Sequence, residues 1–451
     1  MNCLPYSMSA MSAGLLAATT ASLAMGDAPS RWTMHELSND SFDSMAATDL
    51  NNNGVLTGHA VNYAEPWWQH TGFLSSMDGP ESDSIFELDQ IQSYAIVIND
   101  AGVAAGFSND DDQLIRFELV DGVPVATALG DLESNNFTPR LNRINELGMI
   151  CGVVPKGAGI FRAFQWTSQD GLQTIMTGTN VQVMDMNEAG EVVGGSNEGA
   201  FWYDDGHLEM LPGDIALAID DEGRVLLQDD TATSSLFYQY DLNTGDQELI
   251  TEIDMTGWAG AQAIANESGM VALSWQIADP DNPFEELARL ARWTAEDGLM
   301  PMDLSTPTVA IQLMAMNESG MLLYNALQQD YELVAFFAHG LHNNSDFAPS
   351  ERTFGFECDL PYTAIDLNDA GQILYRLSTD NSYGTSVLLS PARAGDTNGD
   401  GAVGIDDLLQ IIGSWGEYTA EDTCGNSIIA DLDGDGEVNI NDLLLCIGDW
   451  D

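Results

Sequence analysis

Between residues 30 and 393, one short pattern of hydrophobic and polar positions recurs along the chain. Each copy places an apolar residue before Asn or Asp, then two variable residues, Gly and a short hydrophobic stretch. The Asx side chain bonds the nearby backbone and Gly adopts positive φ readily, so the pattern predicts a tight turn between two β-strands. The copies lie 33 to 51 residues apart, and their Asx residues are Asn51, Asn99, Asn145, Asn187, Asp220, Asn266, Asn317 and Asn368.

Most copies continue with a second strand and then with an aromatic-rich strand, as in residues 163–166, 200–203, 237–240 and 290–293. Roughly four strands in every ~45 residues is typical of the blades of a β-propeller. The fold class that we predict is therefore mainly β, a β-propeller with seven or eight blades, and eight is the count that we favour. A row of separate sheets with exposed edges is the alternative.

The two ends of the repeat array predict that it closes into a ring. The segment Trp32–Leu37 has the character of the last strand of a blade, and Thr385–Ser390 has that of a penultimate strand. If these two strands pair, the N-terminal strand completes the final blade and removes the open edge.

The repeats resemble the HAF family of extracellular repeats, which share an aliphatic-Asn-x-x-Gly phrase and a later Ala-Phe-x-Trp phrase. The resemblance covers most of residues 40 to 390. The aromatic residues recur at one position of the repeat, and we expect them to pack in the core between blades. They are Trp166, Phe201, Trp202 and Trp293.

Two other aromatic and histidine motifs do not follow the repeat. Trp67 and Trp68 are adjacent, so on a strand they would face opposite sides, and an exposed one could stack on a sugar ring. His339 and His342 stand among Gly and Asn residues, which favours a surface loop over a metal site.

Near the C-terminus, the pattern of a calcium-binding loop occurs twice at an offset of 35 residues. Oxygen ligands at loop positions 1, 3, 5 and 12, with Gly at position 6, suit Ca²⁺, which collects about 6 to 8 oxygens. The backbone carbonyl at position 7 should complete each shell. For two Ca²⁺ ions, the ligands that we predict are Asp396, Asn398, Asp400, Ala402 and Asp407, and then Asp431, Asp433, Asp435, Glu437 and Asp442.

One amphipathic helix is predicted after each loop, and none before it. The apolar residues there are spaced i, i+3, i+4 and i+7, which is one face of a helix. They are Leu408, Ile411, Ile412 and Trp415, and then Leu443, Cys446, Ile447 and Trp450. This loop-then-helix arrangement, half of an EF-hand used twice, resembles a dockerin module. The resemblance implies a small all-α C-terminal domain that binds calcium and docks onto a protein partner of the cohesin type or a divergent equivalent.

The two loops depart from dockerins that bind cohesins at loop positions 10 and 11. Small hydroxyl residues are frequent there, whereas this chain has Ile405 and Asp406 in one loop and Ile440 and Asn441 in the other. These substitutions favour a divergent partner over a standard cohesin.

The chain has 71 acidic and 12 basic residues, which gives a formal charge of −59 at pH 7. Such a charge repels nucleic acids and anionic membranes. Hydrophobic residues still make up 44% of the sequence, so we expect a folded protein with an acidic surface and no nucleic-acid partner. A saline exterior, where salt screens the charge, would suit this surface.

Residues 1–28 include an apolar stretch of small residues, Met11–Met25, although no Lys or Arg precedes Arg31. We interpret residues 1–28 as a secretory signal peptide, 29–393 as the propeller-like repeat domain and 394–451 as the dockerin-like domain. No other segment approaches the length of a membrane span. We therefore expect a secreted protein, extracellular or at the cell surface.

Cleavage of the signal peptide would leave four cysteines, an even number that permits disulfides. Cys424 and Cys446 are near enough in sequence to staple the calcium module. Cys151 and Cys358 lie in distant repeats and are more typical of buried thiols.

The sequence contains no nucleophile elbow, zinc-protease or phosphate-loop motif, and we assign no catalytic residue. We therefore favour a non-enzymatic binding or scaffold propeller that docks through its calcium module. A polysaccharide-active enzyme of the glycoside hydrolase type that carries a dockerin is the alternative, because a carboxylate pair at about 5 to 9 Å cannot be chosen from sequence. Both hypotheses are compatible with a polysaccharide as the ligand of the propeller.

Overall fold

Antiparallel β-strands make up most of the computed structural model of this protein. It describes residues 32–37, 42–62, 69–76, 84–91, 93–108, 112–120, 123–133, 137–255, 260–278, 286–302, 304, 308–328, 333–339, 350–353, 362–377, 385–391, 395, 403–417 and 437–448. The signal peptide that we predict, Trp67, Trp68, His342, Cys358 and Cys424 lie outside these residues.

The strands follow the repeats in sets of four, which we number as sheets in chain order. Sheet 1 has β2 (Ser44–Leu50), β3 (Val55–Asn62), β4 (Gln69–Ser76) and β5 (Ser84–Ile91). Sheet 2 has β6 (Ser93–Ile98), β7 (Ala104–Ser108), β8 (Gln113–Val120) and β9 (Val123–Asp131). Sheet 3 has β10 (Arg140–Ile144), β11 (Ile150–Gly157), β12 (Ile160–Thr167) and β13 (Gly171–Thr179). Sheet 4 has β14 (Gln182–Met186), β15 (Val192–Ser196), β16 (Gly199–Asp204) and β17 (His207–Met210).

The second half of the array repeats the arrangement. Sheet 5 has β18 (Ile215–Ile219), β19 (Arg224–Asp230), β20 (Ser234–Asp241) and β21 (Gln247–Asp254). Sheet 6 has β22 (Ala261–Ala265), β23 (Val271–Ala278), β24 (Glu286–Thr294) and β25 (Gly298–Met302). Sheet 7 has β26 (Thr308–Met316), β27 (Leu322–Gln328), β28 (Leu333–His339) and β29 (Ser350–Thr353). Sheet 8 has β30 (Tyr362–Leu367), β31 (Ile373–Leu377), β32 (Thr385–Pro391) and β1 (Trp32–Glu36).

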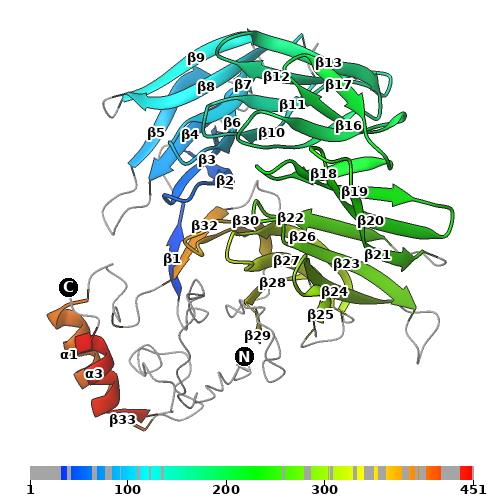
Figure 1. Ribbon diagram of the computed structural model, residues 1–451. Helices are drawn as coiled ribbons and strands as arrows, with labels where there is room; N and C mark the ends of the chain where they lie inside the picture. The colour runs from blue at the N-terminus through cyan, green and yellow to red at the C-terminus, as the bar shows by residue number, and fades with distance from the viewer. Residues whose placement is uncertain are drawn as a thin grey trace.

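The sheets are arranged radially, as in a β-propeller (Figure 1). The first strand of each sheet contacts the first strand of the next, from β2 through β6, β10, β14, β18, β22 and β26 to β30, which returns to β2. These eight strands form the inner circle of the ring, and we call the region around its axis the channel. Sheets 4 and 5 are also joined by one residue pair between β15 and β18, Gly195 with Ile215.

The N-terminal strand completes the last sheet, as predicted. β1 pairs antiparallel with β32 from Trp32 opposite Pro391 to Glu36 opposite Val387. The Leu37 N–H also donates to the Ser386 carbonyl at 2.9 Å. The segments that begin and end the array thus lie side by side, and the ring is closed (Figure 1).

The hydrophobic core is divided among the spaces between neighbouring sheets. Phe201 and Trp293 are buried in two of these clusters and Trp166 in a third, and Trp202 packs against a fourth. The prediction that the recurring aromatic residues pack between sheets is confirmed. Cys151 is a buried free thiol in the same kind of cluster, and burial raises its pKa to about 12.

The described part of the C-terminal module contains two short helices, α1 (Ile405–Gly413) and α3 (Ile440–Gly448). Between them in the sequence, β33 (Gly416–Glu417) pairs antiparallel with β34 (Glu437–Val438). In the part of the chain that the structure covers, neither helix is long and apolar enough to cross a membrane.

Candidate functional site

One end of the propeller is lined by the eight predicted turns, each of which joins the first strand of a sheet to the second. In all eight, the N–H of the Gly donates to the carbonyl of the Asx three residues earlier, at 2.9 to 3.1 Å. The Gly φ lies between 75° and 89°, a region that residues with a side chain seldom adopt. The turn prediction is confirmed. Because the first strands run in the same sense, all eight turns surround one mouth of the channel.

The buried Asx residues of these turns form a belt around the channel. In seven sheets, the Asn Nδ2 donates to the backbone carbonyl of the Asx in the next sheet, at 2.9 to 3.2 Å. The last of these bonds, from Asn368 to Asn51, passes from sheet 8 back to sheet 1. We call this the asparagine belt: Asn51, Asn99, Asn145, Asn187, Asp220, Asn266, Asn317 and Asn368.

The next residue of each turn builds a second circle, closer to solvent. Its backbone N–H donates to a side-chain oxygen of the matching residue in the next sheet, at 2.7 to 2.9 Å in seven cases. All members except Asn52 are carboxylates. We call this the acidic ring: Asn52, Asp100, Glu146, Glu188, Asp221, Glu267, Glu318 and Asp369. Partial burial raises the pKa of Glu188 and Glu318 in this ring.

Both circles are interrupted at the same place, between sheets 5 and 6. Asp220 occupies the belt position but has no amide to donate, and its carboxylate instead accepts the Arg224 Nε at 2.6 Å. Arg224 extends to the next turn, where its Nη2 lies 3.4 Å from the Ser268 carbonyl. Among the described residues, no bond joins the Asp221 N–H to the Glu267 carboxylate.

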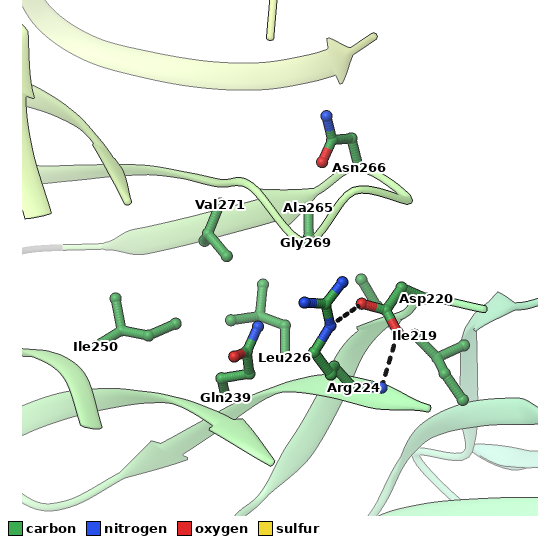
Figure 2. A pocket seen from close by; sticks show the side chains of 11 residues that line it. Ile219, Asp220, Arg224, Leu226, Gln239, Ile250, Ala265, Asn266, Gly269 and Val271 are labelled. Carbon is green, nitrogen blue, oxygen red and sulfur yellow. Dashed lines mark hydrogen bonds and ion pairs between the residues drawn. The ribbon is translucent and has the colours of Figure 1, made fainter. Parts of the chain in front are cut away.

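A small cavity lies at this interruption (Figure 2). Its walls combine the Asp220–Arg224 pair and Gln239 with apolar side chains that include Ile250 and Val271. In sheet 3, the residue equivalent to Gln239 is Gln165, whose Nε2 bonds the Gly190 carbonyl of the following turn at 2.5 Å. The cavity therefore occupies the place that corresponds to the link between sheets 3 and 4.

Glu267 is held from across the channel. Arg143 of β10 donates from Nη2 to the Glu267 Oε1 and from Nη1 to the Asp185 Oδ1, the latter at 3.0 Å. Burial disfavours the charged guanidinium, but the two carboxylates outweigh this and raise the pKa of Arg143. Since sheets 4 and 5 separate the two residues along the ring, this contact spans the mouth.

A second pair of acids lies on the first strands of sheets 8 and 1. Burial, and the charge of Asp366 beside it, raise the pKa of Asp49 well above its usual value. The Asp49 carboxylate also accepts the Ile98 N–H at 2.7 Å, and Asp366 accepts the Leu50 N–H at 3.1 Å. Each acid thus links its sheet to the next.

In the C-terminal module, the structure describes the last ligand position of each predicted calcium loop. Asp407 and Asp442 are both buried, in the first turns of α1 and α3. The Asp407 Oδ2 accepts the Gly404 N–H, and the Asp442 Oδ2 accepts the Asn439 N–H, each at 2.7 Å. The two halves therefore repeat one local geometry, as their sequences predict.

Of the remaining predicted ligands, the structure describes Glu437 alone. Glu437 lies in β34, so its backbone belongs to the module. The others lie outside the described residues: Asp396, Asn398, Asp400, Ala402, Asp431, Asp433 and Asp435. The two ion sites therefore stay a prediction. The burial of Asp407 and Asp442, the carboxylates at position 12, is compatible with it.

The two helices confirm the predicted elements but correct the face that they bury. Ile411 and Cys446 occupy equivalent positions and are buried together with Val403 and Val438. Ile412, Trp415 and Ile447 were predicted on the same faces, yet they are 53%, 51% and 48% exposed. Apolar side chains instead gather on the outward surfaces of both helices. They are Ile405, Leu409 and Ile412 on α1 and Ile440, Leu444, Leu445 and Ile447 on α3, and Trp415 after α1 is exposed as well.

Cys446 is buried, and its Sγ lies 3.5 Å from the Gly395 carbonyl oxygen. Its pairing with Cys424 stays a prediction, since Cys424 is not described.

His339 falls in β28 rather than in the surface loop that we expected.

The sequence contained the residues of the belt and the acidic ring but not their bonds. Each link joins residues 33 to 51 positions apart, except for those that close the ring. The Asn-x-x-Gly pattern predicts the turn, but it does not indicate which group the Asn Nδ2 bonds. Its recurrence in every sheet was the signal that could have suggested a belt.

No protein-family model matches the chain, and no curated protein matches it in sequence. Among solved structures, virginiamycin B lyase from Staphylococcus aureus is similar at 12% identity and a TM-score of 0.40, over 80% of this chain and 99% of that one. The WD40 domain of SCAP from fission yeast is similar at 10% identity and a TM-score of 0.43, over 80% of this chain and 98% of that one. The tricorn protease is similar at 13% identity and a TM-score of 0.38, over 76% of this chain but 38% of that one.

Proposed function

We propose that the protein is a secreted, calcium-binding scaffold. In this proposal each of the eight four-stranded sheets is one blade of a closed propeller, and a dockerin-like C-terminal module attaches that propeller to an extracellular partner. The repeated geometry of Asp407 and Asp442 at the start of two equivalent helices carries the proposal.

Calcium has a structural role in this account. The loops of the module would hold two ions through the predicted oxygen ligands, and Ca²⁺ would neutralise carboxylates that otherwise repel one another. Asp407 and Asp442 would contribute the ligand nearest to each helix while their bonds to the Gly404 and Asn439 N–H groups fix the first helical turn.

The exposed apolar residues of α1 and α3 support a docking role for the module. Leu409 and Leu444 hold equivalent positions on the two helices, and each is 58% exposed. Apolar side chains that stay exposed on both halves of a small domain are typical of a protein interface. The partner that we propose is a cohesin or a divergent equivalent, recognised through Ile405 and Ile440 where hydroxyl residues are frequent in dockerins.

The experiment is a binding assay of the full chain against a panel of cohesin domains, with excess calcium or with chelator. We expect the wild type to bind with excess calcium and not with chelator, and the double variant Leu409→Asp/Leu444→Asp to lose binding in calcium. Leu208→Asp makes the same change at a propeller side chain that is 37% exposed and should bind as the wild type does. Binding that survives both the chelator and the helix variant would contradict the docking role.

A glycan array tests the propeller separately. Polysaccharide binding without release of reducing ends supports the scaffold, whereas product formation would favour the glycoside hydrolase alternative.

A further inference from the structure

The outer strand of sheet 3, β13, differs in composition from the outer strands of the other seven sheets. Charged residues and prolines on an outer strand hinder the pairing of a sheet edge with another chain. Each of the other seven contains at least one: Glu87 in β5, Pro124 in β9, Glu209 in β17, Glu248 in β21, Pro301 in β25, Glu351 in β29 and Glu36 in β1. The nine residues of β13, Gly171–Thr179, include neither kind.

The outer side of β13 is an open sheet edge. β13 is the last strand of sheet 3, and no strand in the described part of the chain pairs with its outer side (Figure 1). Its exposed side chains are uncharged and polar: Gln173, Thr174, Thr177 and Thr179. The bulge at Ile175 does not set β13 apart, since the pairs β4–β5, β8–β9 and β20–β21 contain a register shift as well. The edge is therefore suited to pairing with a further strand.

Sheet 3 is also nearly neutral in a strongly acidic chain. Residues 134–184 contain 4 of the 12 basic and 2 of the 71 acidic residues, which leaves 8 basic and 69 acidic residues for the other 400. Three of these four cations are paired within the molecule: Arg143 with Asp185 at 3.0 Å, and Lys156 and Arg162 with Glu133 at 3.5 and 3.3 Å. The surface of sheet 3 is thus neither rich in carboxylates nor a basic patch that would select a polyanion.

This distribution of charge favours a second copy of the chain as the partner of β13. Two copies repel each other at most surfaces, because each has a formal charge of −59. At about 0.15 M salt the Debye length is about 8 Å, so the charges near a contact dominate and more distant carboxylates are screened. Among the eight outer strands, β13 alone can pair along its length without a charged residue or a proline in either strand.

We propose that the protein forms a dimer in which β13 of one copy pairs antiparallel with β13 of a second copy, across a two-fold axis. The two copies of sheet 3 would then form one continuous sheet of eight strands. Such a dimer would carry two C-terminal modules, which would raise the effective concentration of the second module at a partner with two sites. The pairing uses no residue of the calcium loops, so it is independent of the docking role.

Sedimentation velocity of the full chain in about 0.15 M NaCl tests this, with calcium and with chelator. We expect a concentration-dependent dimer of the wild type in both conditions. Thr174→Glu/Thr177→Glu brings like charges together across the axis and should raise the Kd of the dimer at least about tenfold. Thr174→Lys/Thr177→Lys should have the same effect for the same reason. An equimolar mixture of the two variants should restore the dimer, because opposite charges then meet, and this would also show that both variants fold.

Two control variants place the contact. Gln247→Glu/Leu249→Glu makes a similar change at exposed positions of β21 and should keep the dimer. Leu409→Asp/Leu444→Asp on α1 and α3 should keep it as well. Dissociation by this helix variant, with the β13 variants still dimeric, would place the contact on the module and overturn the proposal. A wild type that stays monomeric up to its highest soluble concentration, or a mixture that fails to restore the dimer, would overturn it too.

Discussion

At the scale of single residues, the belt asparagines use both ends of one amide. Their Oδ1 accepts the N–H four residues on, as Asn51 does from Val55 at 2.8 Å, and this fixes the turn. Their Nδ2 bonds the next sheet, as Asn51 does to the Asn99 carbonyl at 2.9 Å, and this fixes the spacing between sheets. Aspartate supplies the first bond but not the second, which is why the belt is interrupted at Asp220.

The interruption can be repaired. Sheets 3 and 6 carry Met149 and Met270 where sheet 5 has Arg224, so Asp220→Asn/Arg224→Met recreates their pattern. The new amide should donate to the Asn266 carbonyl. The free energy of unfolding of this double variant should equal the wild-type value or exceed it by about 1 kcal/mol. Arg224→Met alone leaves the buried Asp220 carboxylate without its counter-charge, so its free energy of unfolding should be about 3 kcal/mol lower than that of the wild type. Urea denaturation of both variants measures this, and a double variant as unstable as the single one would refute it.

A histidine pair should make the propeller sensitive to acid. Burial, then the charges of His70 and Arg376, lower the pKa of His59 from 6.5 to about 4. The unfolded chain takes up this proton near pH 6.5 and the folded one only near 4, so stability falls as the pH drops through that window. His59→Gln should remove about 3 kcal/mol of that loss.

Urea denaturation at several pH values across this window is the measurement. His207→Gln is the matched control, because the His207 side chain is 69% exposed. The same pH dependence in His59→Gln as in the wild type would show that His59 does not carry the effect.

Local patterns and long-range contacts differed in how far they could be predicted. The turns and the aromatic third strands follow from residues adjacent in sequence, and the structure confirms them. Arg143 and Glu267 lie 124 residues apart, and nothing in the local sequence of either indicates the other. The buried face of α1 was assigned incorrectly at Ile412, because apolar spacing alone does not distinguish a core face from an exposed one when both faces are apolar.

At the scale of elements, β1 carries the closure of the ring. It adds the outermost strand to sheet 8, and Leu37 after it is buried in a cluster with Leu374 and Leu388. A chain that begins at residue 38 should therefore lose cooperative stability throughout the propeller, with a Tm about 10 °C lower than a chain that begins at residue 29. Calorimetry compares the two. Equal melting temperatures with equal protease resistance would mean that the β1–β32 pairing contributes nothing to closure.

At the scale of the whole molecule, the negative net charge opposes folding through electrostatic repulsion. A formal charge of −59 on one chain produces self-repulsion that salt screens. The Tm of the full chain should rise between about 0.02 and about 0.5 M NaCl, as the Debye length falls from roughly 20 to 4 Å. Scanning calorimetry at constant pH measures this, and a flat or falling curve would show that bound cations already compensate the charge.

Calcium titration of the full chain by calorimetry, in enough salt to screen nonspecific binding, decides whether the C-terminal module binds calcium. We expect two saturable sites, both weakened in Asp407→Ala/Asp442→Ala. Asp246→Ala/Glu248→Ala removes two exposed propeller carboxylates and should keep both sites. A wild-type titration without saturable binding, or one that is identical in the Asp407→Ala/Asp442→Ala variant, would contradict the claim that the C-terminal module is a calcium-dependent docking domain.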